Sequence, residues 1–218
     1  MNDLSRRQLL SRGVVFGGGL AAALYLPRPR ALAAAAASDT PEIFSAEEWA
    51  SVEAITSRLI PADHEPGAVE AGCVNFIDKA LAHEDAALRP IYTEGLRGLD
   101  AVSRAHGAGG ARFTALKPSQ QDAVLRAIED GTAEAWPRGG VTGPDFFVQV
   151  WQHTIWAFLA DPKYGGNQGY AGWRLLQYPG GRHVLGGYSP AVMAGKEQVE
   201  AVWGEMLPRR RKDPAEST

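Results

Sequence analysis

The chain has 218 residues, 45% of them hydrophobic and 22% charged, enough for a domain of ordinary size with a hydrophobic core. The 22 basic and 25 acidic residues give a formal net charge of −3. Residues 1–37 contain five arginines and one aspartate, so the remainder has 17 basic and 24 acidic residues. A net charge of −7 is not that of a nucleic-acid-binding protein. A single cysteine, Cys73, excludes an internal disulfide and a cysteine-cluster metal site, and we expect it to be a small core residue.

Residues 1–37 have the features of an export leader. A twin-arginine pattern is formed by Ser5, Arg6, Arg7, Leu9 and Leu10. The apolar stretch that follows, residues 13–26, is rich in glycine and alanine and too short to span a bilayer comfortably. A small-x-small cleavage site lies at residues 31–33; an uncleaved amphipathic anchor is the alternative. The twin-arginine route exports folded proteins, commonly with a cofactor. Since the mature chain shows no cofactor motif, it either binds one without a readable motif or carries a cofactor-bearing partner.

Residues 38–207 are predicted to be an all-α domain of five or six helices with long loops rich in glycine and aromatic residues. Apolar side chains recur at steps of three and four, and no alternating strand pattern is present. The expected helices cover residues 46–60, 69–82, 85–106, 120–129, 144–160 and 191–206. Residues 208–218 are predicted to be a solvated tail with a basic run, for which docking on anionic lipid or on an acidic partner is the alternative.

Several helix ends can be assigned from capping residues. Ser45 and Glu48 form a capping box at the start of the first helix. Ser119 is expected to cap the fourth helix, and Gly131 to follow it in the left-handed conformation. The final helix is expected to follow Ser189.

The helix over residues 144–160 is expected to be central. Pro144 suits its first turn, and Pro162 stops it. A broad apolar face is formed by Phe147, Val148, Trp151, Ile155, Phe158 and Leu159. Phe146 and Trp156 lie off this face, so the helix is apolar most of the way round. We therefore expect it to be buried in its domain or covered by a second protein.

Catalytic chemistry has little support in the sequence. None of the five histidines pairs with another at the spacing of a helical zinc site. Asp63, His64 and Glu65 are metal ligands by type, but adjacent loop residues seldom converge on one ion. The glycines of residues 165–169 follow no strand, so a phosphate-binding loop is not expected. His153 is either a hydrogen-bonded core histidine, which we favour, or a contact to a partner or substrate. No catalytic, cofactor-binding or metal residue is assigned.

The loop after the central helix is rich in glycine and aromatic residues. Its aromatic side chains, Tyr164, Tyr170, Trp173 and Tyr178, must be covered by the chain's own core or by a partner surface. The run DPKYGGNQGYAGWRLLQYPG, following a tryptophan-rich helix, resembles the gluconate 2-dehydrogenase subunit 3 family, the small subunit of membrane-bound flavin-dependent dehydrogenases. Residues 44–80 and the leader share the resemblance, which spans about residues 1–185.

The resemblance implies a non-catalytic subunit in the periplasm, on the outer face of the inner membrane. A large FAD-bearing subunit would oxidise a sugar, sugar acid or polyol, and a multihaem cytochrome c subunit would pass electrons to ubiquinone. This chain, without a cofactor, would stabilise the large subunit and carry it through the twin-arginine machinery. The expected partner interface comprises His153, Trp156, Tyr164, Asn167, Tyr170, Trp173 and Tyr178. The alternatives are a free-standing periplasmic enzyme, with His153 beside a carboxylate, and a helical binding protein.

Overall fold

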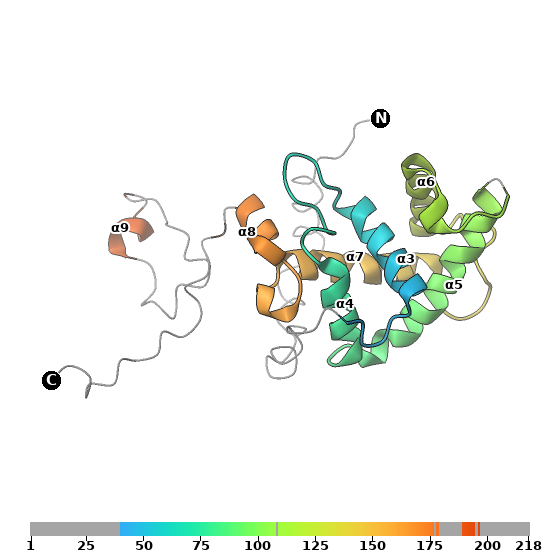
Figure 1. The fold of residues 1–218 in the computed structure, drawn as a ribbon, viewed down its shortest axis with the longest axis horizontal. Coiled ribbons are helices and arrows are strands. Elements are labelled where there is room, and N and C mark those ends of the chain that lie inside the picture. Colours follow the sequence, from blue (N-terminus) through green and yellow to red (C-terminus); the bar gives the residue numbers. More distant parts are fainter. Residues whose placement is uncertain (1–39, 108, 177, 179–188, 195, 197–218) are drawn as a thin grey trace. The chain divides into compact units, whose positions relative to one another are not determined.

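The structure, a computed structural model, describes residues 40–107, 109–176, 178, 189–194 and 196. Contacts along the chain divide it into two units, with the boundary between Ala171 and Gly172, and the described residues up to Ala171 are called the helical unit below. The described residues form seven α-helices, four short 3-10 helices and no strand, which confirms the all-α prediction (Figure 1). The one helix without a predicted counterpart is the short α8 (Ala171–Leu175), while α9 (Pro190–Met193) covers the start of the expected last helix. The predicted leader and tail lie outside the described residues.

The first described helix, α3 (Ala46–Leu59), starts at the predicted capping box. The backbone N–H of Ser45 donates to the Glu48 carboxylate at 2.9 Å, and the Glu48 N–H donates to the Ser45 hydroxyl at 3.3 Å. Both bonds satisfy N–H groups that a helix leaves unpaired at its start.

The next two helices begin later than their periodicity suggests. The second, α4 (Cys73–Ala82), follows Gly72, whose φ of +67° breaks the helical path that was expected from residue 69. The third, α5 (Arg89–His106), is preceded by the 3-10 turn η1 (Ala86–Leu88). Pro90 explains this boundary, because a proline in a helix interior lacks a donor and clashes with the carbonyl four residues earlier.

The prediction that Ser119 caps the fourth helix is wrong. After the 3-10 turn η2 (Phe113–Ala115), α6 (Pro118–Glu129) begins at Pro118, so Lys117 is the N-cap. The Lys117 N–H donates to the Gln120 side chain at 3.0 Å. Proline is favoured in the first turn, where its missing N–H has no helical acceptor. Gly131, with φ +68°, follows α6 in the predicted left-handed conformation.

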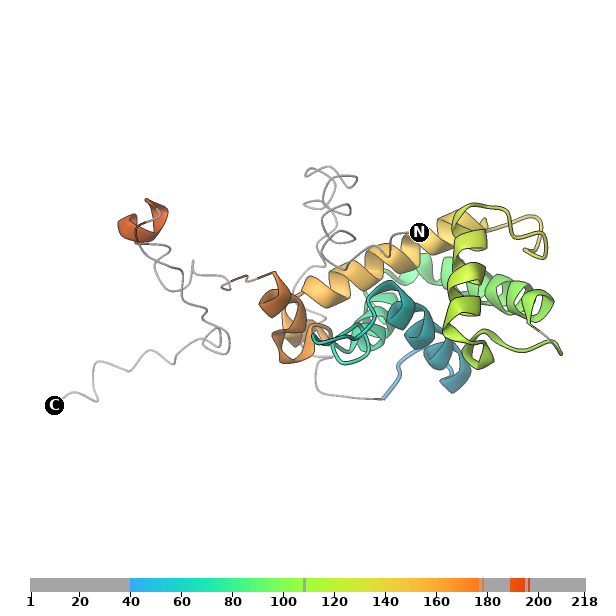
Figure 2. The ribbon, with the colours of Figure 1, turned by 90° about the horizontal axis from the view of Figure 1, so that it is seen from above.

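The central helix is α7 (Gly143–Leu159), which packs against α3, α4, α5 and α6. In Figure 2 it runs along the length of the helical unit, with α3 and α4 to one side of it. Its N-cap is Thr142, whose hydroxyl accepts from the Asp145 N–H at 3.2 Å. It ends before Pro162, as predicted.

The buried face of α7 differs from the broad apolar face that its periodicity marks. The buried face consists of Phe146, Val150, His153, Thr154, Ala157 and Phe158. Of the six residues on the apolar face marked by periodicity, Phe158 alone is buried, whereas Val148 is 48% exposed and the others are half-buried. Because α7 is apolar most of the way round, its own periodicity cannot select between two faces. Packing against the four neighbouring helices makes that selection.

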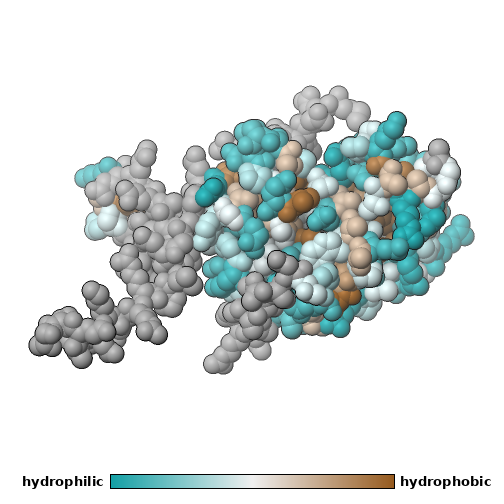
Figure 3. Space-filling model, in the orientation of Figure 1, coloured by the Kyte–Doolittle hydropathy of each residue, from teal (hydrophilic) through white to brown (hydrophobic). Residues whose placement is uncertain are grey.

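Two 3-10 turns, η3 (Pro162–Tyr164) and η4 (Gln168–Tyr170), follow α7. In the second unit, Ser189 caps α9 as predicted, accepting from the Val192 N–H at 3.1 Å. The remainder of the predicted last helix lies outside the described residues. Figure 3 shows the face of the helical unit over α3, α4 and α5, where hydrophilic side chains surround small apolar areas.

Candidate functional site

A buried polar chain joins three elements of the helical unit. His153 of α7 is completely buried, and its Nδ1 lies 2.9 Å from the hydroxyl of Tyr92 on α5. Its Nε2 lies 3.4 Å from the carboxylate of Asp85, just after α4. If the Tyr92 hydroxyl donates to Nδ1, the imidazole proton is on Nε2 and faces Asp85. Burial, together with the Asp85 charge, raises the pKa of Tyr92 well above its usual value, so the hydroxyl is protonated at neutral pH.

Aromatic rings enclose this polar chain. The Tyr92 and His153 rings are stacked with centroids 5.7 Å apart, and Trp156 lies 5.5 Å from His153. Phe44 and Phe146 pack around Tyr92 at 5.8 and 6.2 Å. The result is a closed aromatic core with one internal polar chain.

A free-standing enzyme would use His153 together with a nearby carboxylate. The structure contains such a pair, but a substrate cannot reach it. His153 does lie beside a carboxylate, that of Asp85, whose side chain is 14% exposed. His153 itself has no exposed surface, and both ring nitrogens face protein atoms. A general base has to reach the proton it removes, within about 3 Å or through one water. In this conformation the arrangement connects helices and offers no place for a substrate at the imidazole.

The glycine-rich loop after α7 is held by close backbone contacts. A side chain on Gly166 would overlap the carbonyl of Ala157 in α7. The Asn167 side chain is fully buried and donates to the Ala160 carbonyl at 2.7 Å. On the other side, Asn75 of α4 donates to the Gly165 carbonyl at 2.9 Å. The run Asp-Pro-Lys-Tyr-Gly-Gly-Asn thus attaches the end of α7 to α4.

Two residues of this loop adopt a conformation that is unusual for their type. Asn167 and Tyr170 have φ angles of +48° and +60°. Asparagine tolerates the left-handed region, but a bulky tyrosine there is strained and persists only where surrounding structure enforces it. Such strain is concentrated at functional loops, so this loop is a candidate recognition element.

The predicted interface residues differ in accessibility. His153 and Asn167 are fully buried, whereas Trp156, Tyr164 and Tyr170 are half-buried in the same unit. In the second unit, Trp173 is buried and packs edge-on against Tyr178, with centroids 5.1 Å apart, and Tyr178 is 40% exposed. The structure therefore brings His153 and Trp156 together, as ring neighbours, and Trp173 with Tyr178 in the other unit.

Sequence reasoning did not identify several buried polar residues. Asp78 is 1% exposed and accepts three backbone hydrogen bonds from the segment before α3. Lys79 is fully buried, and its ammonium group has no hydrogen-bond partner among the described residues. Asp85 approaches His153 to 3.4 Å, although the buried Nε2 of His153 has no hydrogen-bond partner among the described residues. Periodicity marks apolar faces, so it gave no signal for these charged residues; their burial depends on which segments fold over them.

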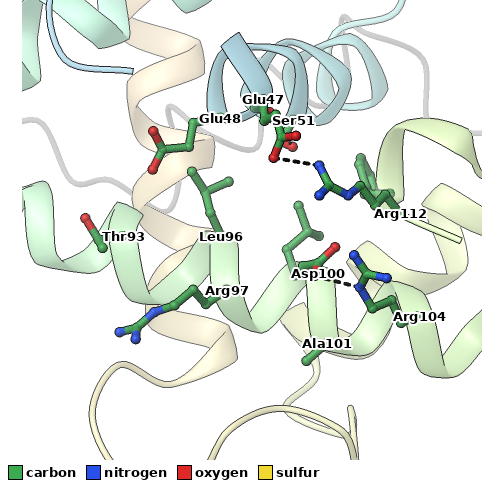
Figure 4. A pocket seen from close by; sticks show the side chains of 12 residues that line it. Glu47, Glu48, Ser51, Thr93, Leu96, Arg97, Asp100, Ala101, Arg104 and Arg112 are labelled. Carbon is green, nitrogen blue, oxygen red and sulfur yellow. Dashed lines mark hydrogen bonds and ion pairs between the residues drawn. The ribbon is translucent and has the colours of Figure 1, made fainter. Parts of the chain in front are cut away.

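An open groove of about 630 Å³ lies between α3, α5 and η2. Figure 4 shows two pairs of its charged side chains facing one another, Glu47 with Arg112 and Asp100 with Arg104. Arg112 contacts Glu47 at 2.6 Å, and Arg104 contacts Asp100 at 2.8 Å. Arg104 and Arg112 are therefore already paired with carboxylates, whereas Arg97, which also lines the groove, is exposed.

The part of the chain that the structure describes contains no candidate metal centre. No group of three or more histidine, cysteine, aspartate or glutamate side chains there could hold a metal ion. Asp63 and His64 lie 3.3 Å apart in an exposed loop. None of the helices described is long and apolar enough to cross a membrane.

The helical unit is an all-α domain in which the glycine-rich loop is held between α4 and α7. The family model described as gluconate 2-dehydrogenase subunit 3 matches residues 46–180. The chain therefore belongs to the gluconate 2-dehydrogenase subunit 3 family, as its motifs suggested. Members of this family are subunits of a dehydrogenase complex. Comparison with curated proteins and comparison with solved structures each gave no match.

Proposed function

We propose that this chain is the non-catalytic small subunit of a periplasmic flavin-dependent dehydrogenase complex that oxidises a sugar, sugar acid or polyol. The observation that carries the proposal is the family match over residues 46–180, which includes both α7 and the glycine-rich loop. In this complex a large subunit binds FAD and oxidises the substrate. A multihaem cytochrome c subunit passes the electrons to ubiquinone at the outer face of the inner membrane.

The role of this chain is to stabilise the large subunit and to carry it through the twin-arginine route. Arg6 and Arg7 supply the export signal, within a leader that is removed after export. A subunit with this role needs a large contact surface and no catalytic residue of its own. Aromatic side chains suit that role because they supply much contact area at low entropic cost.

The proposed interface with the large subunit retains the seven residues predicted from the sequence. Trp156, Tyr164, Tyr170 and Tyr178 have exposed area and can touch a partner directly. His153 and Asn167 are fully buried and act from below the surface, His153 by packing against Trp156 and Asn167 by fixing the loop to Ala160. Trp173 supports Tyr178 in the same way.

The experiment is affinity purification of the full chain, tagged at its C-terminus, from membranes of its native host, followed by a visible spectrum of the eluate. The expected eluate contains a large second polypeptide with flavin and haem c absorbance. Replacing Arg6 and Arg7 by lysine should then remove the large subunit from the periplasm as well. A chain that elutes alone and colourless from an intact membrane fraction would contradict the proposal.

A further inference from the structure

The outward side of α7 carries an apolar stripe that the helical unit leaves partly uncovered. We define the outer stripe as Phe147, Val148, Trp151 and Ile155. Val148 is 48% exposed, and the other three side chains are half-buried. The stripe extends about 12 Å along the helix, at 1.5 Å per residue. One exposed and three partly exposed apolar side chains thus form a continuous patch, and such a patch marks an interaction surface more often than scattered single side chains do.

The outer stripe also lacks charge. After Asp145 in its first turn, α7 contains no aspartate, glutamate, lysine or arginine, and its single histidine is buried. By contrast, α5 exposes Arg97 and Arg104 to solvent, as a surface helix normally does. Depletion of charge around aromatic side chains is the composition of an interface core rather than of a solvated face.

These properties restrict what can cover the outer stripe. A peripheral helix that binds an anionic membrane carries lysine and arginine beside its apolar face, and α7 has neither. Two copies packed stripe to stripe would bury, on each partner, only one face of a helix segment about 12 Å long. A stable interface needs about 800 Å² on each partner. A groove on a partner protein would also cover both flanks of the helix, so even a short stripe could reach this area. This is the helix-in-groove mode of recognition.

We infer that the outer stripe of α7 is the ridge by which this chain docks into an uncharged, apolar groove on the FAD-bearing subunit. The inference rests on the proposed function for the existence of that subunit. The complementarity it requires is apolar with apolar, since a charged groove wall would be buried against α7 without a counter-ion. Trp151 is the central anchor, because tryptophan at the centre of an interface contributes most to affinity.

A matched pair of valines provides the test. Val148 of the outer stripe is 48% exposed, and Val69, in the turn before α4, is 44% exposed. Each is replaced by glutamate in the full chain, co-expressed with the flavoprotein identified in the native eluate. Val148→Glu is expected to lower the amount of flavoprotein retained on the tagged chain by about tenfold or more, because docking would bury an unpaired charge. Val69→Glu is expected to retain it at the wild-type level. Circular dichroism and thermal melting should show both variants folded.

Photocrosslinking identifies the occupant directly. With p-benzoyl-phenylalanine at position 148, irradiation is expected to join this chain to the flavoprotein, and the same probe at position 69 is not. A crosslink from position 148 to a second copy, or to another part of the same chain, would overturn the inference, as would a folded Val148→Glu variant that retains the flavoprotein fully. If the wild-type chain retains no flavoprotein at all, the proposed function fails instead.

Discussion

The Nδ1 atom of His153 lies 2.9 Å from the hydroxyl of Tyr92, and the two rings are stacked with centroids 5.7 Å apart. The contact joins the middle of α7 to α5 inside the aromatic core. A histidine surrounded by tryptophans could be taken for a catalytic or partner-binding group from the sequence. Its complete burial and its two protein neighbours make it an internal connector in this conformation.

Removing the Tyr92 hydroxyl should destabilise the helical unit. In Tyr92→Phe the buried Nδ1 of His153 loses its neighbour, and an unsatisfied buried polar group costs about 1–3 kcal/mol. We expect the free energy of unfolding, from urea denaturation, to fall by that amount. Tyr164→Phe, at a half-buried tyrosine, should change it by less than about 0.5 kcal/mol. Equal effects of the two substitutions would contradict the connector role.

Stability should decrease in alkaline solution through the same tyrosine. Burial and the Asp85 charge raise the pKa of Tyr92 well above the value of about 10 that it has in an unfolded chain. The folded state therefore holds this proton more tightly, so its contribution is fully present below about pH 10 and is lost as the pH rises through the folded-state pKa. Unfolding free energies from pH 7 to pH 11 should fall above pH 10. Burial also raises the pKa of Cys73, so this thiol would add a similar decrease, and both proteins are compared with Cys73 replaced by alanine. In that background, Tyr92→Phe should abolish the part of the decrease that comes from Tyr92.

The single thiol should be unreactive while the protein is folded. Burial raises the pKa of Cys73, and the thiolate is the nucleophilic form. At pH 8 we expect Ellman's reagent to modify the native chain only at the rate of unfolding, and to react rapidly and completely in guanidinium chloride. Rapid modification of native protein would show that Cys73 is accessible and that the α4–α7 packing is looser than described.

Asp78 should be essential for attaching the segment before α3. Its buried carboxylate accepts from the backbone N–H groups of Glu42, Ile43 and Phe44 at 2.6, 3.1 and 2.8 Å. Hydrogen bonds to a charged acceptor contribute about 1.5–3 kcal/mol each, not additively, so Asp78→Ala should cost about 3 kcal/mol or more. Amide hydrogen exchange at residues 42–44 should accelerate in the variant. The exposed Asp130→Ala serves as control, with an expected change below about 0.5 kcal/mol.

Gly166 should be intolerant of a side chain for reasons of space. A β-carbon there would overlap the Ala157 carbonyl, which is part of the α7 backbone and cannot rotate away. Gly166→Ala should destabilise the unit by about 1–3 kcal/mol, as overpacking does. At Gly169 a β-carbon would meet nothing within 4 Å, so Gly169→Ala should cost only about 1 kcal/mol from its φ of +61°. Thermal melts of both variants compare the two costs; a larger loss at Gly169 would contradict this account of the loop.

The helical class, most helix positions and several ends follow from local chemistry that can be read from the sequence. Ser45 and Glu48 satisfy each other's backbone groups. Gly131 adopts the left-handed conformation because glycine has no β-carbon, which is a local property that does not depend on the rest of the fold. The family motifs of the glycine-rich loop also belong to this level, and the family match confirms them. The starts of α5 and α6 are set equally locally, by Pro90 and Pro118, although apolar periodicity alone placed these starts elsewhere.

Burial depended on tertiary structure. For α7, two apolar faces compete, and only the positions of α3 to α6 determine that Phe146 and Phe158 point inward while Val148 remains exposed. The same holds for Asp85 and Asp78, whose partners are distant in the sequence. A sequence by itself shows which residues share a face, because helical geometry is local. Which face is covered, and by what, is a property of the packed assembly.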